Sequence, residues 1–569
     1  MAVAAALLQD APRVPAATDG DATYAAFAER YYSRYFARNP QDATDTGVHR
    51  YDERLPDMTA SEFSAANAEH HADLTALLEI EGGTLSERVR VDAKSLELQI
   101  RDYLLQNETI ELWRRQPSMY VDVASGAVFG LIVRDFAPLG TRFRDVVARE
   151  NGIPNLFATA KANLNHVDST GAEIAGADAL GLAAFLNDDV PKAFKGVGDR
   201  ELQTKFRHST RAAAESARDF ARWVSRFIKH PTGTYAIGAV NYTAMLRYED
   251  AIDLSLDEYL AVGQRALETT RAQMIAVARQ IDPHKSVTQI LADVSRRHPS
   301  GGQLLAASQN DLEQLRAFII RRDIIALPPE RNVRVQETPA FARQVVVAQM
   351  LSPGPLEAVA TQAYYFVSPP DPRDPPHVQA AYLEEFNDFE RPIVSAHEVY
   401  PGHFVNFMHN RHLPLSLTEK LAGNSAFAEG WAHYCEQMIV DEGWGNGDPR
   451  VRLMQLKEAI WRNGRYVAGV KLHTAGMTVA EAQRFFEKEA FLDPATARIE
   501  AKRGTEDPLY GYYTLGKLEI LKLRDDYRKK MGSQFTLAGF HAALLQYGDL
   551  PLPLLRPLIL GADDDGKVL

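Results

Sequence analysis

The sequence predicts a mainly α-helical protein with one small β-sheet, placed just before the stretch Ser395–His403. Two observations indicate this class. Apolar residues recur at helical spacing in most segments before residue 328 and again after residue 379. Between residues 328 and 376, proline and β-branched residues become frequent and the helical spacing is lost. A large helical fold interrupted once by short strands is therefore expected.

The N-terminal helices each show one apolar stripe. Phe27, Tyr31 and Tyr35 recur between Thr23 and Asn39, and Pro40 should stop that helix. The pair Gly82-Gly83 separates the next two helices. Helices of this kind are expected at residues 59–78, 84–107, 143–168, 202–229, 255–281 and 287–297.

The helical pattern returns at Gln379 and continues nearly to the end. A capping box formed by Thr478 and Glu481 marks the start of one helix. The clearest predicted helices cover residues 421–440, 450–474, 479–491, 512–530 and 535–546.

Two β-branched runs predict the sheet. They are Arg343–Met350 and Ala360–Val367, and a proline-rich loop follows at residues 368–376. An exposed strand at 361–367 could pair with an extended peptide, with Tyr364 and Tyr365 as substrate contacts. The equally weighted alternative is a buried strand pair with no role in substrate binding.

Composition limits the classes of function. The net charge of −12 in 569 residues argues against a general nucleic-acid or anionic-membrane binder, which needs a basic patch. No run approaches the roughly 18 apolar residues of a membrane span. The single cysteine, Cys435, excludes an internal disulfide.

Three regions are expected along the chain. Residues 1–22 form a disordered tail or the remnant of a signal peptide, because the apolar N-terminus is short and lacks a preceding Lys or Arg. Residues 23–327 form an N-terminal helical region, and residues 328–569 carry the sheet and the candidate site. Both helical regions are expected to form one unit.

The stretch from His397 to His403 resembles a zinc-peptidase helix. A histidine ligand followed at once by Glu398 is the start of H-E-x-x-H, where the glutamate acts as general base. Pro401 occupies the position of the usual second histidine, and the next histidine is His403. On a straight helix His403 would lie about 120° around from His397, too far to share a metal.

Pro401 and Gly402 could still allow His403 to reach the metal. Proline removes a backbone donor and clashes with the preceding turn, and glycine then adopts conformations closed to other residues. The helix should therefore kink or unwind here and turn His403 in a new direction.

A second segment supplies further polar groups. Glu429, His433 and Glu436 share one helical face, and such groups are costly to bury without partners. Glu429 is the expected third ligand, and Glu436 is expected to orient a ligand histidine. A solvated helix face, or His433 as the ligand, are the alternatives. The set His397, His403 and Glu429 suits Zn²⁺ with one open position.

These motifs resemble a bacterial family catalogued as domain of unknown function 885. Its pattern H-E-x-x-P-G-H-H matches His397–His403, and E-G-W-A-x-Y-x-E matches Glu429–Glu436. The resemblance extends from Asn39–Gly47, through Tyr513–Arg524, to Gly548–Leu552. One departure is Phe404, where the family has a second histidine; we expect the retained His403 to be the ligand.

The resemblance implies a mostly helical fold related to gluzincin metallopeptidases, which bind zinc with two histidines and a glutamate. It also implies a periplasmic or secreted location, although a chain with one cysteine suits the cytosol as well. Related helical zinc peptidases place a late tyrosine over the metal. Tyr513 is therefore the first candidate donor, with Tyr512 as its rival and His473 as a second candidate.

Arginines could hold a substrate carboxylate by paired hydrogen bonds. Arg503 and Arg524 lie in segments that match the family, and Arg462 and Arg465 are further candidates. Any one of them could instead form a structural ion pair.

The combined prediction is a zinc-dependent hydrolase that cleaves short peptides, with Glu398 as general base. Its partners would be a peptide or small amide and, if it assembles, a second copy in a homodimer. The alternatives are a metal-dependent amidase or esterase acting on a non-peptide metabolite, and a non-catalytic helical binding protein with a relic metal site.

Overall fold

The computed structural model describes residues 18–329, 333–338, 348–371 and 373–569. Helices dominate these residues and one small mixed sheet accompanies them, so the predicted fold class is confirmed. The prediction of a tail or signal remnant at residues 1–22 falls mostly outside the described residues. The first described helix begins at Asp19, with Thr18 as its cap.

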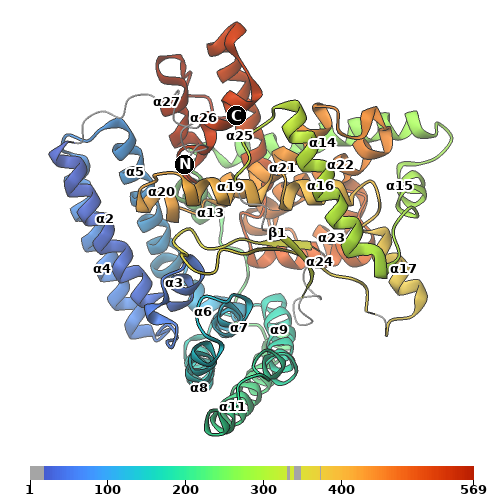
Figure 1. Cartoon of the computed structure of the whole chain (residues 1–569). Helices are drawn as coiled ribbons and strands as arrows, with labels where there is room; N and C mark the ends of the chain where they lie inside the picture. The colour runs from blue at the N-terminus through green and yellow to red at the C-terminus, as the bar shows by residue number, and fades with distance from the viewer. Residues whose placement is uncertain (1–17, 330–332, 339–347, 372) are drawn as a thin grey trace.

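The first group of helices forms one flank of the molecule, coloured blue in Figure 1. Of the stripe predicted in the first helix, Phe27 and Tyr31 are buried and Tyr35 is partly buried, in a core shared with α4 and α5. Gly82 and Gly83 separate α4 from α5, as expected. The bounds are α2 (Asp19–Arg38), α3 (Pro40–Thr46), α4 (Ala60–Glu81) and α5 (Glu87–Leu104).

The second group packs around its own apolar core, at the bottom of the view in Figure 1. Aromatic residues such as Phe143, Phe157 and Phe220 fill that core. The bounds are α6 (Leu112–Arg115), α7 (Ser118–Val133), α8 (Leu139–Asn163), α9 (Ser169–Asp188), α10 (Val190–Ala193), α11 (Arg200–Val224) and α12 (Arg226–Lys229).

A buried carboxyl group in this second core gives a testable pH dependence. Glu150 of α8 is fully buried, and it accepts hydrogen bonds from Ser209 and Thr210. Burial raises the pKa of Glu150 from 4.5 to about 7, against the lowering effect of those hydrogen bonds. An acid whose pKa is raised by folding destabilises the fold progressively as pH rises from its unfolded pKa to its folded pKa.

We therefore expect Glu150→Gln to raise the free energy of unfolding by about 2–3 kcal/mol at pH 8 and to have little effect near pH 4.5. Urea unfolding followed by circular dichroism at both pH values measures the difference. Glu215→Gln, on the exposed face of α11, is the control. An equal effect of Glu150→Gln at both pH values contradicts the prediction.

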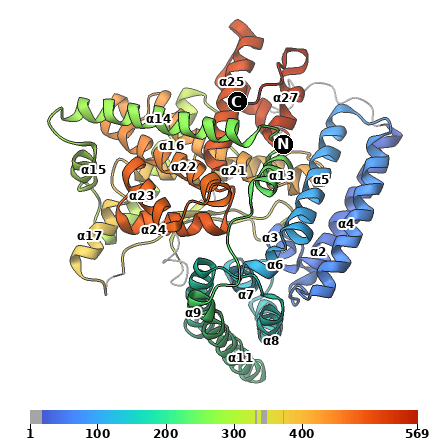
Figure 2. The same ribbon diagram turned by 180° about the vertical axis from the view of Figure 1, so that it is seen from behind.

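The third group forms the largest body of the molecule and carries the candidate site (Figures 1 and 2). Its core includes Leu267 and Met274 from before residue 328 together with Met454 and Trp431 from after it. The bounds before the sheet are α13 (Ala239–Asp250), α14 (Leu256–Ile281), α15 (Val287–Ser295) and α16 (Leu304–Arg322). The predicted division at residue 328 stays a prediction.

The helices after the sheet run to the C-terminus. The capping box of Thr478 and Glu481 is present at the start of α23, as predicted. The bounds are α17 (Pro376–Glu384), α18 (Arg391–Glu398), α19 (His403–His412), α20 (Leu417–Leu421), α21 (Ser425–Asp441), α22 (Pro449–Thr474), α23 (Val479–Glu489), α24 (Pro494–Glu506), α25 (Tyr512–Met531), α26 (Leu537–Leu545) and α27 (Leu552–Leu560).

The sheet contains β1 (Val333–Glu337), β2 (Ala348–Leu351) and β3 (Ala363–Val367) in the order β1-β3-β2. β1 pairs parallel to β3, and β2 pairs antiparallel to it with Met350 opposite Tyr365. The prediction of 361–367 as an exposed edge is therefore wrong, because β3 is the central strand. The first residues of the predicted strand 343–350 lie outside the described residues, and its end forms β2.

Among the described residues, no helix combines the length and apolar character that a membrane crossing needs.

Candidate metal centre

Three side chains from three helices converge at one point. His397 lies near the end of α18, His403 begins α19, and Glu429 lies in the second turn of α21. Oε2 of Glu429 is 3.2 Å from Nε2 of His397 and 3.4 Å from Nε2 of His403. One ligand atom from each residue lies within 4.8 Å of the others, so the group could hold a metal ion.

A break between two helices makes this convergence possible. α18 ends at Glu398 and α19 starts at His403, so the predicted interruption at Pro401-Gly402 is confirmed. The Gly402 N–H donates to the carbonyl of Ala396 at 2.9 Å. A Cβ at Gly402 would lie 1.7 Å from the carbonyl oxygen of His397, so only glycine fits. Trp431 Nε1 donates to the Pro401 carbonyl at 3.1 Å and ties the break to α21.

His403 and Phe404 of α19 point in different directions. Phe404 is fully buried and packs edge-on against Tyr400, with ring centroids 5.6 Å apart. It points into the apolar core, whereas the preceding His403 faces His397 and Glu429. The absence of a second histidine at position 404 therefore leaves the group of three intact.

Glu436 contacts the imidazole nitrogen of His397 that does not face Glu429. Nδ1 of His397 donates to Oε1 of Glu436 at 2.7 Å, which leaves Nε2 directed at Glu429. Arg462 pairs with the same oxygen at 3.1 Å, and Nδ1 of His433 lies 3.0 Å from the other oxygen. This is the position of a carboxylate that orients a ligand histidine. His433 lies behind Glu436 and is not one of the three converging residues.

The charges favour a cation at the centre. Burial alone would lower the pKa of His397, but the nearby carboxylates of Glu429 and Glu436 raise it to about 10. Burial would raise the pKa of Glu429, and the nearby His403 and His397 hold it well below its ordinary value. Positive charge is therefore stabilised where the three side chains meet, and a bound metal ion would supply it.

Glu398 lies beside this group and is held by the sheet. Its Oε2 accepts a hydrogen bond from the Met350 N–H of β2 at 2.8 Å. Burial raises the pKa of Glu398, while His397 and His403 act in the opposite direction. Among the described strands, β2 therefore contacts Glu398; it lies at one edge of the described sheet, and its outward N–H fixes one oxygen of the carboxylate.

Tyr513 and Tyr512 differ in their hydroxyl partners. The Tyr513 ring lies 6.4 Å from the His397 ring, and no described group hydrogen-bonds its hydroxyl. The Tyr512 hydroxyl donates to Asp507 at 3.2 Å and accepts from Arg503 at 3.1 Å. Tyr513 is thus the tyrosine whose hydroxyl remains available beside the site.

Arginines surround the Tyr513 ring. The guanidinium carbons of Arg465, Arg462 and Arg503 lie 5.0, 5.4 and 6.0 Å from its centroid. Arg465 is paired with Glu500, and Arg462 with Glu436, as structural ion pairs. Arg503 keeps 36% of its side chain exposed.

Four other predicted residues lie elsewhere. His473 donates from Nε2 to the Gly504 carbonyl at 2.7 Å, and it lies eleven residues beyond Arg462, about 16 Å along α22. Arg524 donates to the Tyr434 hydroxyl at 3.4 Å, a similar distance along α25 from Tyr513.

The two strand tyrosines contact other residues. Tyr365 is fully buried and hydrogen-bonds Ser395 at 3.2 Å, and Tyr364 stacks on Phe366. Because β3 is central, neither can offer a free strand edge to a substrate. The sequence did not predict that the Met350 N–H contacts Glu398. The β-branched run ending at Met350 predicted only that a strand lies there.

Replacing the supporting carboxylate should weaken metal binding. Glu436→Gln removes the negative partner of Nδ1 on His397 but keeps its volume, so metal affinity should fall about 10–100-fold. Isothermal titration of metal-free protein with Zn²⁺ measures this. Glu442→Gln, just after the end of α21, is the control. Unchanged affinity in Glu436→Gln would show that Glu436 is only a structural ion-pair partner.

The fold and site together define a class: a large helical protein with a buried His-His-Glu group between three helices. The chain belongs to the family described as "Bacterial protein of unknown function (DUF885)", whose model matches residues 40–559. The family resemblance seen in the sequence is thereby confirmed.

Two solved structures share the whole fold. One, from Shewanella oneidensis, is titled "a putative lipoprotein of unknown function"; it is 25% identical, with a TM-score of 0.79 over 94% of this chain and 99% of that one. The other, "the putative lipoprotein from Colwellia psychrerythraea", is 16% identical, with a TM-score of 0.81 over 95% of this chain and 99% of that one. No curated protein matches the chain.

Proposed function

We propose that the protein is a zinc-dependent hydrolase that cleaves peptide bonds in short peptides. The observation that carries this proposal is the convergence of His397, His403 and Glu429 beside the carboxylate of Glu398. Two imidazole nitrogens, one carboxylate oxygen and an adjacent base are the groups that a hydrolytic zinc site requires.

The donors fit the proposed ion. Oε2 of Glu429 is buried without a hydrogen bond although two histidine nitrogens lie within 3.4 Å of it. A buried carboxylate oxygen in that position is expected to bind a cation. A zinc ion held there would activate water and polarise the substrate carbonyl.

The protein's own groups would handle the protons. The Met350 N–H holds Oε2 of Glu398, so the other oxygen can take a proton from the attacking water and deliver it to the leaving amine. The Tyr513 hydroxyl, free of other partners, would donate to the carbonyl oxygen as negative charge builds there.

The surroundings favour a peptide over a compact metabolite. β2 is an edge strand next to Glu398, and an extended peptide can pair with such an edge. Arg503, which lies beside Tyr513 and pairs with Asp507 at 3.5 Å, would hold a carboxylate of the substrate. We also propose a location outside the cytoplasm, supported by the two relatives described as putative lipoproteins.

The direct test is cleavage of a mixed peptide library by zinc-loaded protein, followed by mass spectrometry. Cleavage that stops on chelation and returns with zinc supports the proposal. Turnover of small amides or esters with no peptide cleaved would favour the amidase or esterase alternative. A fully folded protein that cleaves neither class would favour the non-catalytic binding protein.

A further inference from the structure

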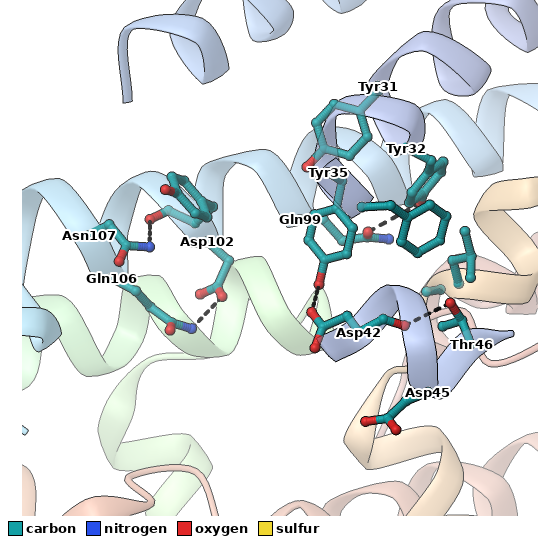
Figure 3. Close-up of a pocket in the computed structure, with 14 residues that line it drawn as sticks. Tyr31, Tyr32, Tyr35, Asp42, Asp45, Thr46, Gln99, Asp102, Gln106 and Asn107 are labelled. Carbon is teal, nitrogen blue, oxygen red and sulfur yellow. Dashed lines mark hydrogen bonds between the residues drawn. The ribbon is translucent and has the colours of Figure 1, made fainter. Parts of the chain in front are cut away.

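A polar cavity separate from the candidate metal centre lies between α2, α3 and α5 and the end of α20. It has a volume of about 440 Å³. Figure 3 shows tyrosines of α2 on one side, Asp42 and Asp45 of α3 below them, and Asp102 opposite. No lysine, arginine or histidine is among the residues that line it. The cavity is therefore an acidic space with aromatic walls.

Its carboxylates are not neutralised from within the cavity. Asp42 accepts a hydrogen bond from Tyr35, and Oδ1 of Asp102 is buried with no hydrogen-bond partner. Burial raises the pKa of Asp102 to about 7 and that of Asp45 to about 6. Arg134 and Arg149 act on Asp45 from outside the cavity and donate to backbone carbonyls.

The hydroxyl of a buried tyrosine also points into the space. Tyr31 is only 6% exposed, and its hydroxyl makes no hydrogen bond to any described residue. Figure 3 shows it directed into the cavity from α2. A hydroxyl that faces a cavity and has no protein partner is free to hydrogen-bond a ligand. This observation points to a ligand independently of the carboxylates.

Two stretches of the chain connect the walls of the cavity with the candidate metal centre. The chain leaving β2 reaches Gly354, which packs tightly against the carbonyl of Asp45, and Leu356 N–H donates to the Thr46 carbonyl at 2.9 Å. Gly354 is four residues beyond Met350, at most about 14 Å of extended chain. Ala422, in the connector leading to Glu429, lines the cavity directly.

We propose that this cavity is a subsite for a cationic nitrogen group of the substrate, an ammonium or guanidinium. The inference rests on the proposed peptide substrate. Three carboxylates would attract the positive charge, and the faces of the Tyr31, Tyr35 and Tyr103 rings would contact it. The Tyr31 hydroxyl would accept a hydrogen bond from the cationic N–H.

Three probes test the inference by fluorescence anisotropy on zinc-loaded Glu398→Gln protein, which should not consume them. The first is an N-acetylated alanine hexapeptide carrying one arginine, scanned through each position. The second replaces that arginine with neutral citrulline. The third restores a free amino terminus to the citrulline peptide, which separates an N-terminal ammonium from a side chain.

One charged probe should bind at least about tenfold more tightly than the acetylated citrulline peptide. Asp45→Asn with Asp102→Asn should abolish that advantage, whereas Asp188→Asn, exposed at the end of α9, should preserve it. Tyr31→Phe is a milder change and should reduce the binding advantage of the charged probe. It tests the inference if the double variant does not fold. Equal binding of charged and neutral probes overturns the inference.

The two proposals fail in different ways. In one outcome, the wild-type protein cleaves no peptide and yet binds the charged probe more tightly, with the difference lost in the Asp45→Asn, Asp102→Asn double variant. This result supports the cation site and rejects the hydrolase. Peptide cleavage by the wild-type protein with no preference for arginine or a free amino terminus supports the hydrolase and rejects the cation site.

Discussion

Replacing Glu398 with glutamine should lower peptide hydrolysis by about 10²–10⁴-fold while zinc binding is retained. The glutamine oxygen can still accept the Met350 N–H that holds Oε2 of Glu398 at 2.8 Å, so the side chain should stay in place. Only the capacity to take a proton is lost. Turnover of a fluorogenic peptide chosen from the library and zinc content by mass spectrometry measure the two properties separately.

The control for Glu398→Gln is Glu215→Gln on the exposed face of α11, which should change neither property. Retained turnover in Glu398→Gln would remove Glu398 from the mechanism. Loss of zinc together with turnover would instead mean that Glu398 contributes to the metal site itself.

Replacing Gly402 with alanine should disrupt both the fold near the site and metal binding. The new Cβ would lie 1.7 Å from the His397 carbonyl oxygen and 2.5 Å from that of Ala396. Both contacts are with backbone, so α18 and α19 must move apart and carry their histidines with them. We expect a loss of about 3 kcal/mol or more in the free energy of unfolding and greatly weakened zinc binding.

Gly181→Ala is the matched control for Gly402→Ala, because a Cβ at Gly181 meets no atom within 4 Å. It lies inside α9, where alanine is favoured over glycine by roughly 0.5–1 kcal/mol, so stability should stay equal or rise. Thermal unfolding and zinc titration of both variants decide the matter. Wild-type zinc affinity in Gly402→Ala would contradict the role given to the break between α18 and α19.

Local chemistry made much of the candidate site predictable. Pro401 and Gly402 indicated that the helix must break, and the structure has two helices joined at that point. The helical spacing of Glu429 and Glu436 placed both on one face, and both contact His397. Such inferences depend on residues a few positions apart, whose relative geometry the backbone fixes.

Long-range packing was not predictable in the same way. Strand order depends on which runs pair, so the sequence could not show that β3 is central and that β2 reaches Glu398. The helices α7 and α9 are rich in small and apolar residues all round, and they gave no clear stripe. His473 and Arg524 lie in recognisable helices, but their distance from the site depends on how those helices pack.

The most direct test of the central claim is the metal content of the purified protein, measured by mass spectrometry beside His403→Ala and the exposed His208→Ala. We predict close to one zinc ion per chain in the wild-type protein and in His208→Ala, and almost none in His403→Ala. A folded wild-type protein that contains no metal and takes up no added zinc would contradict the account, as would undiminished zinc binding in His403→Ala.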